Sequence, residues 1–199
     1  MRHHPARAMY DLLEDALTSI TMQLRSAIEA DAGRPGRNGA SSSTLLRASG
    51  WARQMSIELG SVLLDTLGLA ATIEWHIRQF QKCTGVTCEL VVKYAAGFDL
   101  PEDYAESVFD IYNEALSNVA RHAAASRVAI SLTITPREVT MIVRDNGIGL
   151  SEAAFASATG GLAGMRARSR AYQGYCEIIG TRNAGTTVTV NLPIPAGRR

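Results

Sequence analysis

The stretch that decides the fold is residues 128–143, VAISLTITPREVTMIV. From Val128 to Ile134 each apolar side chain alternates with a small one, and the alternation resumes at Val139 after Thr-Pro-Arg-Glu. A period of two places all the large apolar side chains on one face of a strand. The stretch therefore predicts a β-hairpin with one buried face.

Further strands extend this hairpin into a sheet. Residues 176–180 and 186–192 have strand character and are joined through Asn-Ala-Gly at 183–185. Residues 87–93 form another short β-branched run before Gly97. A turn rich in Asn and Gly between two such runs is typical of a hairpin. The sequence thus predicts a mostly antiparallel sheet.

Helices are expected between these strands. Residues 69–82 keep apolar side chains on one helical face, and a second helix begins at Pro101 with acidic residues in its first turn and runs to about His122. A shorter helix follows Gly164. Helices on one face of the sheet give a two-layer α/β sandwich of the α+β class, expected over residues 68–199.

Residues 1–67 have a different pattern, which predicts a helical hairpin. Residues 31–43, DAGRPGRNGASSS, are typical of a flexible loop. On either side of the loop, apolar residues recur every three or four positions. A hairpin alone buries little surface, so it either pairs with a second copy in a dimeric four-helix bundle or packs on the C-terminal domain. The apolar seam comprises Met9, Leu13, Ala16 and Ile20 before the loop and Leu45, Ala52, Met55 and Leu59 after it.

Composition excludes several classes of protein. The 199 residues are 46% hydrophobic and 20% charged with a net charge of +1, which argues against disorder and against direct nucleic-acid binding. Three cysteines are too few for a disulfide scaffold. No apolar run approaches the ~20 residues that span a bilayer, and the N-terminus lacks a signal-peptide core. A cytoplasmic location is therefore expected, with membrane association only through a sensor segment outside this sequence.

The first chemical motif is NEALSNVARH at residues 113–122. On a helix, Glu114, Asn118 and either Arg121 or His122 share one face. A stripe with a carboxylate, an amide and a cation is either a solvated surface or one wall of a site.

The second motif is DNGIG at residues 145–149, directly after a strand. Asp-Asn-Gly by itself is usually a turn. Here the apolar strand places Asp145 at its end, where a buried carboxylate can accept a hydrogen bond from an exocyclic amine such as that of adenine. The glycines Gly147 and Gly149 allow close approach of the backbone to a ligand.

The third motif is GGLAGMR at residues 160–166. A glycine-rich loop that opens into a helix presents backbone N–H groups to phosphate. The motif lacks the Gly-Lys-Ser/Thr of a Walker loop.

In this order and spacing, the three motifs resemble the nucleotide-binding domain of the gyrase, Hsp90, histidine-kinase and MutL superfamily. Residues 113–122, 145–149 and 161–168 most resemble sensor histidine kinases of the nitrate-sensor type, and residues 63–69 are similar to the junction between their dimerisation hairpin and ATPase domain. The resemblance implies ATP and Mg²⁺ as cofactors, a homodimer and a response-regulator receiver domain as partners, and phosphoryl transfer in two-component signalling.

The resemblance also implies roles for individual residues that occupy matching positions in the three motifs. Asn118 would bind Mg²⁺, Asp145 would bind adenine and Glu114 would orient the attacking group. The other nucleotide-binding residues that the resemblance implies are Arg121, His122, Gly147, Gly149, Gly161, Leu162, Gly164, Met165 and Thr187.

One position departs from the family. The family has its phosphate-accepting histidine near the start of the first hairpin helix, where this chain has Tyr10. A phenol with a pKa of about 10 is a weaker nucleophile at neutral pH than an imidazole with a pKa of about 6.5. The alternatives are a kinase core whose acceptor position is vacated and a pseudokinase that uses ATP as a conformational or partner-pairing ligand. An anti-sigma-type serine kinase is a third, disfavoured by the hairpin and the nitrate-sensor-like motifs.

Overall fold

The computed structural model describes residues 63–150 and 161–197. The chain divides into two units, Met1–Val62 and Leu63–Arg199, and all described residues belong to the second. The expected helical hairpin, its loop at 31–43 and Tyr10 lie outside the described residues. Residues 63–67 are helical, and Leu64 belongs to the core of the second unit. This unit begins at Leu63, five residues before the boundary that was expected between 67 and 68.

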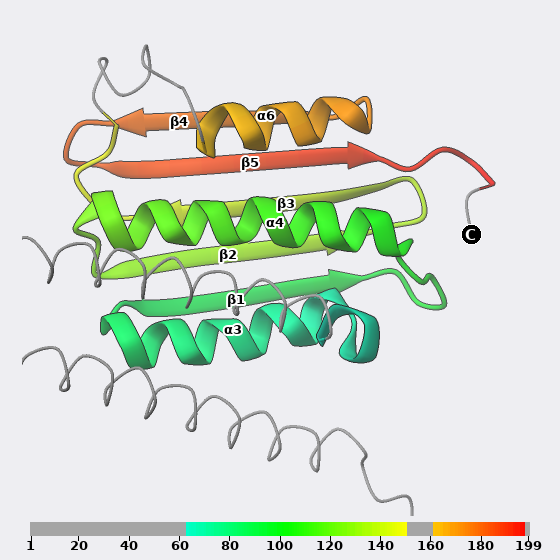
Figure 1. Cartoon of the computed structure of the whole chain (residues 1–199), viewed down its shortest axis with the longest axis horizontal. Helices are drawn as coiled ribbons and strands as arrows, with labels where there is room; N and C mark the ends of the chain where they lie inside the picture. The colour runs from blue at the N-terminus through cyan, green and yellow to red at the C-terminus, as the bar shows by residue number, and fades with distance from the viewer. Residues whose placement is uncertain (1–62, 151–160, 198–199) are drawn as a thin grey trace, which may run out of the picture. The chain divides into compact units, whose positions relative to one another are not determined.

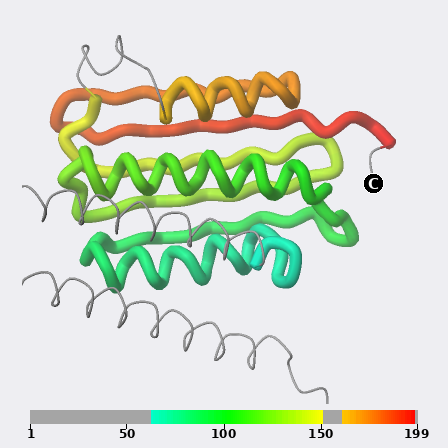
Figure 2. The backbone as a smooth tube through the Cα atoms, in the orientation of Figure 1, coloured from blue at the N-terminus to red at the C-terminus, as the bar shows by residue number. Residues whose placement is uncertain are grey.

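Five strands form one mixed sheet in the order β1-β2-β3-β5-β4. Both predicted hairpins are confirmed, because β2 pairs antiparallel with β3 and β4 pairs antiparallel with β5. Strand β1 pairs parallel with β2, and α4 makes the crossover between them, which can be followed along the tube in Figure 2. The strands are β1 (Thr87–Tyr94), β2 (Arg127–Ile134), β3 (Glu138–Asp145), β4 (Tyr175–Thr181) and β5 (Gly185–Pro193).

Three α-helices cover one face of this sheet, as Figure 1 shows: α3 (Leu69–Thr84), α4 (Glu102–Asn118) and α6 (Gly161–Ala171). Pro101 precedes α4, and Glu102 and Asp103 lie in its first turn, where acidic groups favour the positive end of the helix dipole. The helix expected to reach His122 changes geometry after Asn118, because η1 (Val119–Ala123) is a π-helical turn. The predicted two-layer arrangement is confirmed for the described part of the chain.

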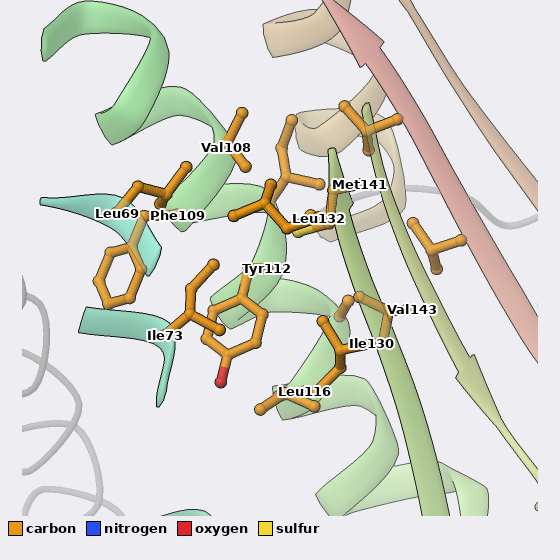
Figure 3. Close-up of a cluster of buried hydrophobic side chains, with 14 of the residues drawn as sticks. Leu69, Ile73, Val108, Phe109, Tyr112, Leu116, Ile130, Leu132, Met141 and Val143 are labelled. Carbon is orange, nitrogen blue, oxygen red and sulfur yellow. The ribbon is translucent and has the colours of Figure 1, made fainter. Parts of the chain in front are cut away.

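The core lies between the helices and the sheet. Figure 3 shows Val108, Tyr112 and Leu116 of α4 facing Ile130 of β2 and Val143 of β3. Tyr112, Ile130 and Leu116 are each at most 2% exposed. The strict alternation in β2 and β3 produces this layer, since Val128, Ile130, Leu132, Val139, Met141 and Val143 all point toward the helices and are buried.

The opposite face of the sheet is exposed in the part of the chain that the structure describes. Arg144 of β3 lies beside Thr187 of β5, and Thr187 lies beside Ile179 of β4. Ile179 is 55% exposed and Arg144 is exposed. Side chains on this face therefore point away from the helices and from any site that lies between the two layers.

His76 of α3 lies in the seam between α3 and α4. Its Nδ1 atom and the Tyr112 hydroxyl share a hydrogen bond of 3.1 Å, and the imidazole contacts the rings of Phe109 and Tyr112 edge-on. Burial lowers the pKa of His76 from 6.5 to about 4. The imidazole is therefore neutral at pH 7 and packs as part of the domain interior.

Candidate functional site

A cavity of about 550 Å³ opens between the helices and one end of the sheet. Its walls come from α4, η1, the end of β3 with the loop after it, the start of α6, and strands β4 and β5. The volume is in the range of sites that hold a small organic molecule. The lining residues are Glu114, Ala115, Asn118, Val119, Arg121, His122, Ala123, Val143, Asp145, Ile148, Gly149, Leu150, Gly161, Leu162, Ile178, Thr186 and Val188.

The polar stripe predicted on α4 forms one wall of this cavity. Glu114 and Asn118 lie on α4, and both Arg121 and His122 line the cavity from η1. The helical spacing placed either of these two side chains on the face of Glu114, and the family resemblance implied both. Both residues belong to the π-helical turn that continues α4.

The Arg121 side chain forms hydrogen bonds with Ser117, one turn earlier on the same helical segment. Its guanidinium donates to the Ser117 backbone carbonyl at 3.2 Å and to the Ser117 hydroxyl at 2.6 Å. The same guanidinium lies 3.9 Å from the Glu114 carboxylate. Glu114 and Arg121 therefore form a loose ion pair at the edge of the cavity.

Asp145 is the buried carboxylate of the site. It is 6% exposed, it ends β3, and its Oδ1 accepts a hydrogen bond of 2.8 Å from the Gly147 backbone N–H. Among residues 63–150 and 161–197, this N–H is the only hydrogen-bond donor to the Asp145 carboxylate. Because Asp145 lines the cavity, its second carboxylate oxygen is available there as an acceptor for a ligand.

Steric contacts explain why glycines follow Asp145, and the sequence alone did not predict these contacts. A Cβ at Gly147 would overlap the Ala123 carbonyl, and a Cβ at Gly149 would overlap the Thr181 carbonyl. Gly149 also has a φ of 76° and lines the cavity, whereas Gly147 does not line it. These glycines let residues 145–150 pack between η1 and the β4–β5 hairpin, and for Gly147 this contact replaces the expected approach to a ligand.

Asn146 contributes to this loop in a way that sequence reasoning missed. Its side-chain oxygen accepts hydrogen bonds from the backbone N–H groups of Ser126 and Arg127 at 3.0 and 2.9 Å. Its amide nitrogen donates to the Ser126 hydroxyl at 3.0 Å. Asn146 thus joins the end of β3 to the start of β2 and holds Asp145 in place.

The glycine-rich third motif divides between cavity and core. Gly161 and Leu162 line the cavity, but Gly164 and Met165 do not. Met165 is 0% exposed and belongs to the hydrophobic core, because its helical position faces the sheet. Farther along α6, Arg168 forms an ion pair of 3.0 Å with Asp110 of α4, which fastens the two helices together.

The structure places Thr187 away from the cavity. Thr186 lines the cavity instead, because successive residues of β5 point to opposite faces of the sheet. The sequence contained the signal for this correction, since Thr186 shares its alternation with the buried Val188, Val190 and Leu192. Sequence reasoning also missed the apolar lining residues Ile148, Leu150, Ile178 and Val188.

Comparisons with known proteins concern the region of the chain that contains this cavity. Residues 104–196 match the family described as histidine kinase-, DNA gyrase B-, and HSP90-like ATPase, and this range includes every residue that lines the cavity. The chain is 30% identical over 142 residues to the signal transduction histidine-protein kinase/phosphatase DegS of Brevibacillus brevis, covering 71% of this chain and 36% of that protein. It is 31% identical over 197 residues to the sensor histidine kinase NarS of Mycobacterium tuberculosis, covering 95% of this chain and 44% of that protein.

The chain contains the catalytic ATPase core of a two-component sensor histidine kinase. The histidine kinase domain of the blue-light activated kinase from Erythrobacter litoralis EL346 has the same fold, with a TM-score of 0.54, 16% identity, and coverage of 89% of this chain and 96% of that one. This kinase core spans less than half the length of the DegS and NarS relatives.

ATPase domains of this family bind ATP, and the cavity fits that ligand in volume and in its unpaired Asp145 oxygen. The described residues contain no group of three or more His, Cys, Asp or Glu side chains that could hold a metal ion. A magnesium site with few protein ligands is typical where phosphate oxygens and water complete the coordination. None of the kinase core's described helices is long and apolar enough to cross a membrane.

Proposed function

We propose that this kinase core transfers the γ-phosphoryl group of Mg-ATP in two-component signalling, with ATP bound in the cavity between α4 and α6. The observation that carries the proposal is the buried Asp145 carboxylate, which is aimed into the cavity and has a single donor among the described residues. An adenine amine supplies the missing donor. Guanine presents a carbonyl oxygen at that position, which an ionised carboxylate repels.

The lining of the cavity includes an apolar group and a charged group of side chains. Ile148, Leu150 and Val188 lie with Asp145 among the lining residues and suit the faces of a purine ring. Arg121 and His122 lie with Glu114 and Asn118 on the α4–η1 wall and suit phosphates. These two groups support a bound nucleotide whose base is buried and whose phosphates reach the open side.

Roles for the charged group follow from the chemistry of its side chains. The Asn118 side-chain oxygen is a hard ligand that suits Mg²⁺, and the metal supplies charge neutralisation between the phosphates. Glu114 accepts a hydrogen bond from the attacking group and orients it. Backbone N–H groups of Gly161 and Leu162 at the start of α6 face phosphate oxygens. Phosphoryl transfer in such sites depends mainly on positioning and electrostatics.

The acceptor and the partners complete the proposal. A response-regulator receiver domain is the proposed final acceptor, in keeping with relatives named as a signal transduction histidine-protein kinase and a sensor histidine kinase. Tyr10 stands at the proposed acceptor position, which favours a second candidate function, an ATP-binding pseudokinase that acts through conformation or by pairing with an active partner.

Replacement of Asp145 by Asn tests the adenine assignment. We expect Asp145→Asn to weaken ATP binding by about 1–3 kcal/mol, because Asn has only one acceptor oxygen for two donors, the Gly147 N–H and the adenine amine. The unsubstituted chain is expected to bind ATP well and GTP poorly. Isothermal titration calorimetry with Mg-ATP and Mg-GTP measures both effects.

The matched control is Thr189→Val, on the exposed face of the sheet beside Ile142. This variant is expected to keep the ATP affinity of the unsubstituted chain. Equal affinities of the unsubstituted chain for ATP and GTP would contradict the role of Asp145.

Dimerisation through residues 1–67 is a separate prediction. Ile20→Asp places an unpaired charge in the proposed apolar seam, which is strongly unfavourable in a buried interface. We expect a dimer mass for the unsubstituted chain and a monomer mass for the variant by multi-angle light scattering. A monomer mass for the unsubstituted chain at micromolar concentration argues against the four-helix bundle.

A further inference from the structure

The Glu114 side chain of α4 packs directly against the backbone of Gly161, the first residue of α6. A Cβ added at Gly161 would overlap the Glu114 carboxylate at both Oε1 and Cδ, and it would lie 3.0 Å from Cγ. The end of the Glu114 side chain therefore occupies the space that any residue other than glycine would need at position 161. No other described glycine of α6 is in this situation, because a Cβ at Gly164 would meet only the tip of Arg168 at 4.0 Å.

The Glu114 carboxylate is also held from its other side. Arg121 lies 3.9 Å away, and Ser117 fixes Arg121 through two hydrogen bonds of 3.2 and 2.6 Å. Because Ser117 and Glu114 lie on α4 and Arg121 lies on η1, this side of the contact belongs to a continuous helical segment. Gly161 is the part of the contact that comes from a different element.

Electrostatics favour this position of the carboxylate. Helix α6 has eleven residues, and its first turn carries the positive end of the helix dipole. Glu114 lies at that end and beside a guanidinium, so its charge is stabilised from two directions. The close contact with the Gly161 backbone and these charges together restrict the position of the Glu114 carboxylate.

We propose that Gly161 is a positioning residue for Glu114. This inference rests on the proposed function, in which Glu114 orients the attacking group. By having no side chain, Gly161 lets the carboxylate sit at the start of α6 and thereby fixes the distance between Glu114 and the phosphate end of the cavity. Gly161 then contributes to the rate of phosphoryl transfer more than to the affinity for the nucleotide.

The test is Gly161→Ala in a chain that also has Tyr10→His, so that transfer can be followed with γ-labelled Mg-ATP. A catalytic group misplaced by about 1 Å can cost about 100-fold in rate, so we expect a loss of about 10- to 100-fold at saturating Mg-ATP. The Kd for Mg-ATP should change by less than about twofold, since Asp145 and the apolar walls are unaltered and alanine keeps the backbone N–H proposed to face phosphate. Ala163→Ser, which adds one atom at an exposed position of α6, is the matched control and should leave rate and affinity unchanged.

A double-mutant cycle tests whether the methyl group added by Gly161→Ala acts through the Glu114 side chain. In a Glu114→Ala background, Gly161→Ala should cause no further loss of rate, because the overlapping atoms have been removed. The same cycle can be read without nucleotide as the midpoint of thermal unfolding. Gly161→Ala should lower the midpoint only when Glu114 is present, whereas Gly164→Ala should not lower it.

Two results would overturn the inference. One is an equal effect of Gly161→Ala with and without Glu114, in rate or in unfolding midpoint. The other is a loss of Mg-ATP affinity with an unchanged rate at saturation, which would limit Gly161 to the proposed backbone contact with phosphate and leave it no part in positioning Glu114. If no variant binds ATP, the proposed function fails, and the nucleotide-free unfolding cycle still decides whether Gly161 positions Glu114.

Discussion

Replacement of Tyr10 by histidine is expected to convert a chain that does not label into one that gains an acid-labile, base-stable phosphate from γ-labelled Mg-ATP. The cavity has Glu114, Asn118, Asp145 and the start of α6 in place, so the proposed kinase lacks only the acceptor. In the reaction, an imidazole nitrogen forms a bond to the γ-phosphorus while the bond to the bridging oxygen breaks and ADP leaves. An unprotonated imidazole is abundant at neutral pH and a phenolate is scarce.

Asn118→Asp in the Tyr10→His chain is the control for this experiment. It replaces the proposed metal ligand with a charged group and should abolish most of the labelling without touching position 10. Labelling of the unsubstituted chain as strongly as of the variant would show that Tyr10 is not the vacated acceptor position. ATP binding without labelling of either chain would favour the pseudokinase.

The free energy of unfolding is expected to depend on pH through His76. Burial lowers the His76 pKa from 6.5 to about 4, so between these pH values the unfolded chain binds a proton that the folded chain does not. Stability from this group is present above pH 6.5 and is lost as the pH falls toward 4. Two and a half pKa units at ~1.4 kcal/mol each predict a loss of about 3 kcal/mol.

Chemical denaturation at several pH values measures this effect. His76→Gln should remove this share of the pH dependence and leave the contribution of other groups. Tyr112→Phe removes the hydroxyl bonded to His76 but leaves the imidazole buried, so the dependence should remain. A pH profile of His76→Gln identical to that of the unsubstituted chain would rule out His76 as its source.

Local pattern was enough to predict most elements of the ATPase domain. The alternation at 128–143 predicted β2 and β3, and the Asn-Ala-Gly turn predicted the β4–β5 hairpin. The same alternation, followed two residues beyond Val143, leads to Asp145 on the buried face, where it lines the cavity. These features depend on the spacing of apolar residues within one helix or strand, and this spacing can be read directly from a single sequence.

Contacts between distant elements were not predictable in this way. Gly147 is required by the Ala123 carbonyl and Gly161 by the Glu114 carboxylate, and in each case the two partners belong to different elements. The π-helical turn at 119–123 also interrupts a regular helical pattern without a local signal such as proline. Arg121 and His122, which both line the cavity, lie on that turn.

The sequence by itself determined the strands, the three α-helices and the order of the three motifs that contribute to the cavity, although α6 begins at Gly161 and not after Gly164 as expected. Only the tertiary structure decided the sheet order β1-β2-β3-β5-β4, the position of Thr186 in the cavity in place of Thr187, and the burial of Met165 in the core. The physical reason is the range of the interactions. Periodicity reports which side of an element is buried, whereas strand pairing and close backbone contacts depend on which other element lies there.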